Sequence, residues 1–219
     1  MICTGGTTGR PKGVMWRQGD TYVVSMNGAD HSSVAEIHEK VRHCGPPWFA
    51  VSPLMHAAGL WTTLAAVLGG QTVVLYDNRA AFDARTVLET AEREQVGLMT
   101  MVGDAYAGPL VAELRRRPYD LSSLSAVASG GAATNPTHQR ALLELLPNIA
   151  MVNGYGSSET GNVGFGRSRH DDRKDTFELR AGASVVSADL RRFLRPGDPE
   201  IGWVAREGRI PLGYFDDPE

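Results

Sequence analysis

The sequence predicts an α/β fold in which helices cover both faces of a central sheet. Two observations predict it. Short apolar segments with the composition of buried strands recur along the chain, and segments with helical periodicity separate them. The 219 residues allow one or two domains, and a hydrophobic fraction of 42% is sufficient for a packed core.

Four segments rich in Val, Met and aromatic residues are predicted as strands inside the sheet. They are residues 48–51, 72–76, 98–102 and 149–152. Gly69 and Gly70 interrupt the apolar stretch from 60 to 76, and each remaining part is too short to span a bilayer. We therefore expect a buried helix, a turn and a buried strand there.

Two helices are marked by their first residues. In the segment 82–95, Val87, Leu88 and Ala91 share one helical face, and Asp83 is a suitable N-cap. The segment 136–146 follows the same pattern: Asn135 is its expected N-cap, and Pro136 occupies the first helical position.

The chain begins with a loop rich in glycine and threonine, residues 4–13, which carries Lys12. Glycines let backbone N–H groups approach an anion, hydroxyls donate further hydrogen bonds, and the lysine supplies positive charge. The order of residues differs from a Walker A loop, because Pro11 precedes Lys12 and Gly13 follows it. Proline disfavours helical geometry at the preceding residue, so we expect Lys12 outside a helix, in a loop that closes over the outer phosphates of a nucleotide.

A second segment, residues 153–161, reads Asn-Gly-Tyr-Gly-Ser-Ser-Glu-Thr-Gly. It combines an aromatic face, hydroxyls and one carboxylate. We expect it, like the other motifs, in a loop at the end of a strand, where α/β enzymes bind ligands. Together the two segments indicate an enzyme that handles ATP and magnesium.

These motifs resemble those of the AMP-forming adenylating enzymes, which include acyl-CoA synthetases, luciferases and the adenylation domains of peptide synthetases. The resemblance covers nearly the whole chain in order and spacing. Besides the two segments above, it includes residues 53–59, similar to a Pro-x-x-His-x-x-Gly segment beside the acyl pocket, residues 129–133, similar to an adenine-side turn, and residues 196–214, similar to the stretch before a ribose-binding aspartate. Within this family, the region of Trp16 and the sequence of residues 157–161 resemble most closely those of fatty-acid and steroid-type acyl-CoA ligases.

The resemblance implies a role for each matching residue. Lys12, Glu159 and His56 would be catalytic, with Glu159 as the Mg²⁺ ligand. Nucleotide binding would fall to Thr4, Gly5, Gly6, Thr7, Thr8, Gly9, Lys12, Gly130, Gly131, Ala132, Gly154, Tyr155, Gly156, Ser157 and Ser158. Three alternatives stay open: Tyr155 as a core residue, His56 as a hydrogen-bonded core residue, and residues 130–132 as a plain tight turn.

The implied reaction is ATP-dependent activation of a carboxylic acid, fatty or steroid-type, to an acyl-adenylate and then to acyl-CoA. ATP, Mg²⁺ and coenzyme A would be the cofactors and co-substrates. The carboxylate is already a nucleophile, so the protein has to supply charge neutralisation and in-line positioning.

The resemblance also implies that the chain is a partial adenylation domain over residues 1–219, incomplete at both ends and without the C-terminal lid domain. We expect little activity from it alone. The alternative is a non-catalytic remnant of an acyl-CoA ligase that retains residual nucleotide binding. A serine hydrolase is excluded, because no Gly-x-Ser-x-Gly elbow surrounds Ser129 or Ser157.

Composition limits the remaining possibilities. The net charge of −3 gives no reason to expect nucleic acid as a partner. Two cysteines, Cys3 and Cys44, form no disulfide framework, and no signal peptide or transmembrane segment is recognisable, so we expect a cytoplasmic protein. The region 28–47 contains three histidines and Cys44 without the paired spacing of a zinc site, and we expect a surface excursion there. The oligomeric state stays open.

Overall fold

The computed structural model describes residues 1–5, 11–42, 44–77, 81–171 and 176–216. The helices in this part of the chain are α1 (Gln18–Ser25), α2 (Val34–Arg42), α3 (Ala57–Leu68), α4 (Ala84–Arg93), α5 (Gly103–Arg116) and α6 (Pro136–Leu145). The strands are β1 (Ile2–Thr4), β2 (Lys12–Met15), β3 (Trp48–Ala50), β4 (Val73–Leu75), β5 (Leu98–Met101), β6 (Ala126–Ser129), β7 (Ala150–Ser157), β8 (Gly161–Ser168), β9 (Glu178–Leu179), β10 (Ala183–Val186), β11 (Trp203–Arg206) and β12 (Gly213–Tyr214).

A sheet with the strand order β4-β3-β5-β6-β7-β8-β9 forms the centre of the molecule. The strands from β4 to β7 are parallel, and β8 and β9 continue the sheet in antiparallel pairing. The predicted α/β class and all four predicted strands are confirmed. The prediction that residues 72–76 form an interior strand is wrong, because among the described strands β4 lies at the edge of the sheet beside β3, and Leu75 is 53% exposed.

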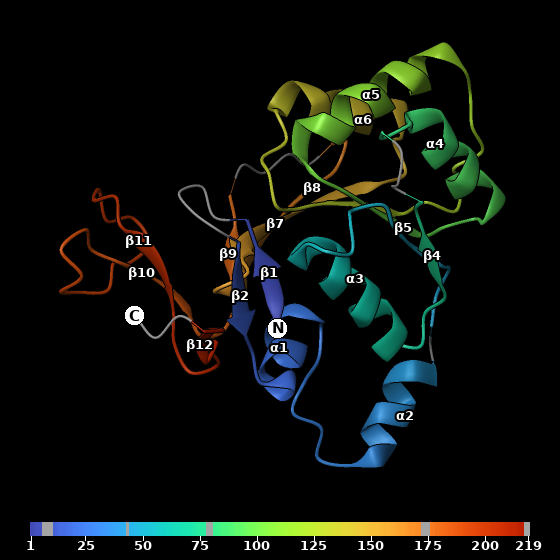
Figure 1. Cartoon of the computed structure of the whole chain (residues 1–219). Coiled ribbons are helices and arrows are strands. Elements are labelled where there is room, and N and C mark those ends of the chain that lie inside the picture. The colour runs from blue at the N-terminus through green and yellow to red at the C-terminus, as the bar shows by residue number, and fades with distance from the viewer. Residues whose placement is uncertain (6–10, 43, 78–80, 172–175, 217–219) are drawn as a thin grey trace.

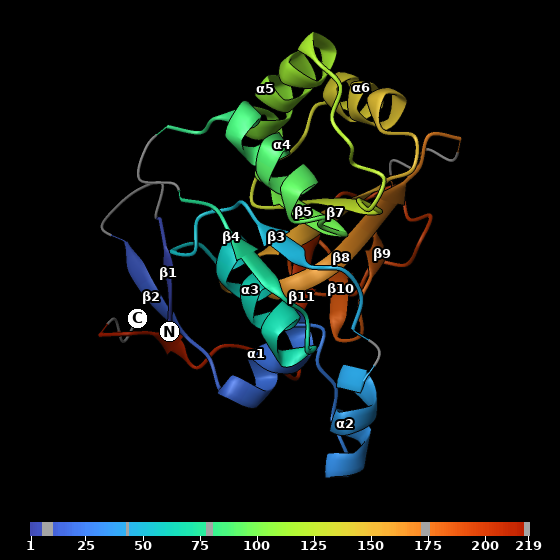
Figure 2. The ribbon, with the colours of Figure 1, turned by 90° about the vertical axis from the view of Figure 1, so that its right-hand side faces the viewer.

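Three helices, α4, α5 and α6, lie together on one face of this sheet (Figures 1 and 2). They pack on the strand residues that point to that face, since successive side chains of a strand alternate between faces. The resulting core contains Phe49, Met99, Met101, Val127 and Met151 from the strands, and Val87, Leu88, Ala91, Leu110, Leu142 and Leu143 from the helices. The predicted apolar face of α4 is thus confirmed.

Both predicted N-caps are present. The Asp83 carboxylate accepts hydrogen bonds from the backbone N–H groups of Arg85 and Thr86, which lack partners inside the first turn of α4. Asn135 Oδ1 accepts from Thr137 N at 2.8 Å, and Pro136 takes the first position of α6.

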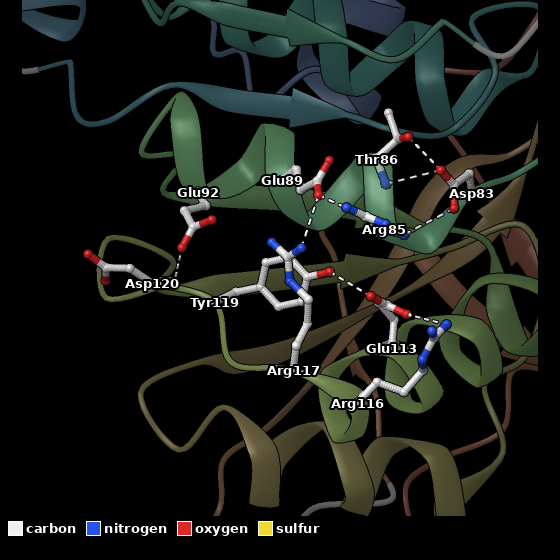
Figure 3. Close-up of polar contacts among 10 residues, drawn as sticks. All are labelled: Asp83, Arg85, Thr86, Glu89, Glu92, Glu113, Arg116, Arg117, Tyr119 and Asp120. Atoms are coloured by element: carbon white, nitrogen blue, oxygen red, sulfur yellow. Dashed lines mark hydrogen bonds and ion pairs between the residues drawn. The ribbon is translucent and has the colours of Figure 1, made fainter.

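Polar side chains join both α4 and α5 to the segment that follows α5 (Figure 3). The buried Glu113 carboxylate accepts a hydrogen bond of 2.8 Å from the Tyr119 hydroxyl and pairs with Arg116 at 3.2 Å. On the exposed side, Glu89 bridges Arg85 and Arg117 at 2.8 and 3.2 Å. The buried carboxylate therefore has partners for both of its oxygens, which burial requires.

On the other face of the sheet, α3 and α1 form a second, smaller core with the hairpin of β1 and β2. Its buried residues are Ile2, Val14, Trp16, Val24, Met26 and Trp61. β12 adds to β2 as a third strand, with Tyr214 opposite Val14. This core attaches the N-terminal hairpin to the body of the molecule.

The helix α5 was not predicted from the sequence. α5 contains Pro109 and begins at Gly103 with φ of +53°, which obscures its helical pattern.

Candidate functional site

The glycine- and threonine-rich segment joins two paired strands. Thr4 at the end of β1 lies opposite Lys12 at the start of β2, so the connecting segment leaves and re-enters the hairpin at neighbouring positions. Lys12 lies outside any helix, as its neighbour Pro11 predicts. The prediction that it lies in a loop is wrong, because Lys12 is the first residue of β2 and pairs with Thr4. Gly5 is exposed at the start of the connection. The predicted nucleotide-binding residues Gly6, Thr7, Thr8 and Gly9 lie outside the described residues.

The second signature forms a β-hairpin, and the prediction of a loop at a strand end is wrong for its first half. β7 continues through Gly154, Tyr155 and Gly156 and pairs with β8. The pairing shifts register after Tyr155, and a Cβ atom at Gly156 would lie 2.1 Å from the carbonyl oxygen of Gly161. The glycines permit this close approach of two backbones, which explains why a glycine-rich segment is extended here.

The tip of this hairpin presents Glu159. Ser157 Oγ accepts hydrogen bonds from the backbone N–H groups of Glu159 and Thr160, both at 3.2 Å. Thr160 Oγ1 accepts in return from Ser157 N at 3.0 Å. Such side-chain to backbone bonds define the conformation of a turn. Ser158 and Glu159 are therefore held at its half-buried outer positions.

The two signature segments meet in space. Trp16 Nε1 donates a hydrogen bond of 2.8 Å to the carbonyl oxygen of Ser158. The Tyr214 hydroxyl donates to Glu159 Oε1 at 3.1 Å, and Lys12 Nζ lies 4.8 Å from the centre of the same tyrosine ring. Lys12 and Glu159 thus contact the same side chain, Lys12 over the ring and Glu159 at the hydroxyl. Sequence reasoning assigned no role to Tyr214, and no local pattern could have revealed one.

A cavity of about 590 Å³ lies between the turn after β6 and the start of the β7–β8 hairpin. Its lining includes Gly131, Ala132, Thr134, Gln139, Asn153, Tyr155 and Phe177. Tyr155 is 49% exposed, and its ring is tilted against Phe177 with 5.7 Å between the centroids. The alternative that Tyr155 is a core residue is therefore wrong.

The turn of residues 130–132 follows β6 directly. Gly131 has φ of +81°, a conformation that favours glycine, and Gly130 N donates to the Met101 carbonyl at 3.4 Å. Gly131 and Ala132 also line the cavity. The glycine therefore meets the needs of a tight turn and leaves room for a flat ligand at the same place.

His56 stands at the N-cap position of α3, and its side chain makes no capping hydrogen bond. The residue is exposed, so the alternative of a hydrogen-bonded core histidine is wrong. It follows β3 at the carboxyl end of the parallel strands, the same edge at which β6 leads into residues 130–132.

A second cavity, of about 680 Å³, lies on the sheet face that carries α3. Trp48, Leu98 and Val152 contribute apolar surface, and Arg167 and Arg180 contribute positive charge. The Arg180 guanidinium donates to the Val24 carbonyl at 2.9 Å, and burial lowers its pKa.

The histidine-containing excursion places its residues on separate structures. His31 Nε2 is 2.8 Å from the Tyr22 hydroxyl, His38 lies on α2, and α2 buries none of its residues. His43 lies outside the described residues. Over the described ranges, no three His, Cys, Asp or Glu side chains gather closely enough to hold a metal ion. Within the same ranges, every helix is too short or too polar to cross a bilayer.

Known proteins resemble this chain in sequence and in fold. The sequence model of the AMP-binding enzymes matches residues 1–191. The chain belongs to the AMP-binding enzyme family. Among curated relatives, it is 41% identical to the medium-chain acyl-CoA ligase Mig of Mycobacterium avium, over 99% of this chain and 41% of the relative. It is 30% identical to the 3-oxocholest-4-en-26-oate–CoA ligase of Rhodococcus rhodochrous, again over 99% of this chain and 41% of the relative.

Solved structures confirm the fold of this family member. VinN in complex with L-aspartate gives a TM-score of 0.75 at 21% identity, covering 100% of this chain and 52% of VinN. The O-succinylbenzoate coenzyme A synthetase MenE of Bacillus subtilis, in complex with ATP and magnesium ion, gives 0.72 at 22% identity, covering 99% and 42%. The chain therefore spans about two fifths of the curated relatives and has the layered architecture of adenylate-forming domains.

Proposed function

We propose that residues 1–219 form part of the adenylation domain of an AMP-forming acyl-CoA ligase. In its first step a carboxylate oxygen bonds to the α-phosphorus of ATP, and pyrophosphate leaves. In the second step the thiol of coenzyme A attacks the acyl carbon, and AMP leaves. The observation that carries this proposal is the contact of both Lys12 and Glu159 with Tyr214, which brings a cation and a carboxylate to one place.

The charges at this place suit a magnesium nucleotide. Lys12 would neutralise negative charge on the outer phosphates, and Thr7 and Thr8 would donate hydrogen bonds to them. Glu159 offers an oxygen ligand on a turn whose geometry is fixed by Ser157, and Mg²⁺ in nucleotide sites takes one or two carboxylates plus phosphate oxygens. When bound, the ion would offset negative charge that develops on the phosphates as the P–O bond breaks.

The 590 Å³ cavity supports the placement of the base. Tyr155 would stack on adenine, and Gly131 and Ala132 would leave space for the flat ring. Ser158 would donate to the α-phosphate. The residues that would complete the nucleotide site are Thr4, Gly5, Gly130, Gly154, Gly156 and Ser157.

The acid is proposed to be a medium- or long-chain fatty acid or a steroid side-chain acid, because the curated relatives bear those names. His56, exposed at the start of α3, would lie at the entrance for its carboxylate. The competing proposal is a remnant that binds nucleotide without turnover.

Nucleotide binding and pyrophosphate exchange separate these two proposals. The purified chain is titrated with Mg-ATP by calorimetry, alongside Lys12→Ala and Glu159→Gln. Arg42→Ala and Glu39→Gln, on the exposed α2, are the charge-matched controls. We expect the site variants to weaken Mg-ATP binding about tenfold or more and the controls to leave it unchanged.

ATP–pyrophosphate exchange driven by decanoate or a long-chain acid then decides between ligase and remnant. Exchange supports the ligase, and binding without exchange supports the remnant. A folded chain that takes up no Mg-ATP would contradict both.

A further inference from the structure

The 590 Å³ cavity contains a series of hydrogen bonds made by side-chain amides, and the structure determines which group donates at each step. Gln139 Nε2 lies 2.8 Å from the backbone carbonyl oxygen of Thr134. A carbonyl oxygen only accepts hydrogen bonds, so the NH₂ group of Gln139 has to face it. Gln139 Oε1 therefore points the other way, as an acceptor.

The next link follows from the first. Asn153 Nδ2 lies 3.1 Å from Gln139 Oε1 and donates to it. The reverse orientation would place two carboxamide oxygens against each other, which costs more than a lost hydrogen bond in this half-buried position. Asn153 Oδ1 is thus turned away from Gln139, and both residues line the cavity beside Tyr155.

Other contacts hold Thr134 in place, so the first acceptor of this hydrogen-bond series is fixed. The residue is buried, and its Oγ1 lies 2.8 Å from the buried Ser129 Oγ. At the next residue, Asn135 N donates to Asp104 Oδ1 at 2.8 Å. The carbonyl that orients Gln139 therefore belongs to a segment with little freedom to turn.

We propose that Gln139 is a positioning residue that fixes the carboxamide of Asn153, so that the cavity selects 6-aminopurine over 6-oxopurine nucleotides. An oxygen presented to the base accepts from an exocyclic amino group and opposes an exocyclic carbonyl, the pattern by which asparagine recognises adenine. The inference rests on the proposed function, because it places the base in this cavity.

The test is the ratio of ATP to GTP affinity, measured by calorimetry with magnesium on the full chain. In the unsubstituted protein we expect ATP to bind more tightly than GTP. Gln139→Leu removes both hydrogen bonds and frees the Asn153 amide, and should lower the ratio about tenfold. Arg140→Leu, the same replacement at the next, exposed position of α6, is the matched control and should leave the ratio unchanged.

Two charged variants separate orientation from packing. Gln139→Glu keeps an acceptor for Asn153 Nδ2 and should retain most of the ratio. Gln139→Lys offers only donors, so Asn153 has to turn its oxygen toward residue 139, and the ratio should fall below that of Gln139→Glu by tenfold or more. The added charge acts on both triphosphates alike and cancels in the ratio. A purely structural role would affect the ratio equally in the two variants.

The outcomes distinguish the two proposals. A folded unsubstituted chain that binds neither nucleotide overturns the proposed function and this inference with it. A chain that binds ATP, but whose ATP to GTP ratio is equal in the Leu, Glu and Lys variants, overturns the inference alone.

Discussion

The Tyr214 hydroxyl donates a hydrogen bond to Glu159 Oε1 at 3.1 Å across 55 residues of sequence. Tyr214 belongs to β12, which pairs with β2, the strand that begins at Lys12. The tyrosine therefore joins the strand that carries the lysine to the hairpin tip that carries the acid. Its ring serves Lys12 and its hydroxyl serves Glu159, so the two contacts can be removed one at a time.

Tyr214→Phe keeps the ring below Lys12 and removes the hydroxyl. We expect the free energy of unfolding to fall by about 1 kcal/mol, because a hydrogen bond to a carboxylate is lost at a half-buried site. Tyr214→Leu also removes the ring and should cost about 0.5–1 kcal/mol more. Urea titrations followed by circular dichroism measure both. Equal stability of the Phe variant and the unsubstituted protein would show that the Glu159 contact contributes nothing.

Gly156→Ala tests the β-hairpin of the second signature. Its Cβ atom would lie 2.1 Å from the Gly161 carbonyl oxygen, a distance that only a shift of the backbone can relieve. We expect a loss of about 1–3 kcal/mol in urea unfolding and a displaced Glu159.

Gly130→Ala is the control, because the nearest atom to its added Cβ is the Gly154 carbonyl oxygen at an ordinary 3.8 Å. Gly130→Ala should lower the free energy of unfolding less than Gly156→Ala does. Equal losses would mean that the tight pairing of Gly156 with Gly161 does not determine which glycine is required.

Local features of this fold could be predicted from the sequence, because their causes lie within a few residues. Asp83 and Asn135 cap helices through backbone N–H groups two or three residues away, and the face of α4 follows from a period of 3.6. The apolar strands could likewise be predicted from their composition. Their positions in the sheet could not, because β4 has the composition of an interior strand and lies at the edge.

The candidate site was predictable only in part. The signatures named Lys12 and Glu159, yet the side chains that join them come from distant positions. Trp16 reaches Ser158 across 142 residues, and Tyr214 comes from the last described strand. Glycine is depleted in strands on average, so Gly154 and Gly156 favoured a loop. The glycine at position 156 is explained by the close approach of Gly161 across the β7–β8 hairpin, a pairing that composition alone does not reveal.

Asp83→Ala removes the N-cap of α4 and should cost about 0.5–2 kcal/mol in urea unfolding. Asp83→Asn, which keeps an acceptor oxygen, should recover most of the lost stability.

The hydrogen bond from the Thr86 side chain lowers the pKa of the Asp83 carboxyl, and bonds from backbone N–H groups lower it further. A lowered pKa stabilises the fold above the ordinary carboxyl range, and this contribution disappears as the pH falls through the lowered value. The difference between the Asp83 protein and the Asn variant should therefore shrink in acid.

The alkaline limit of stability should depend on Tyr119. Burial, followed by the hydrogen bond to Glu113, raises the pKa of Tyr119 to about 12 from an ordinary 10.0. The unfolded chain then loses this proton at lower pH than the folded chain does. The contribution of this pKa difference to the free energy of unfolding is complete below the ordinary pKa of 10.0. It is lost as the pH rises toward the folded-state pKa of about 12. Tyr119→Phe should thus be less stable than the unsubstituted protein at neutral pH, because Glu113 loses a donor, and the difference should narrow in alkali. Urea unfolding at neutral and alkaline pH, with phenolate absorbance to follow the titration, measures this, and a gap that widens in alkali would contradict the assignment.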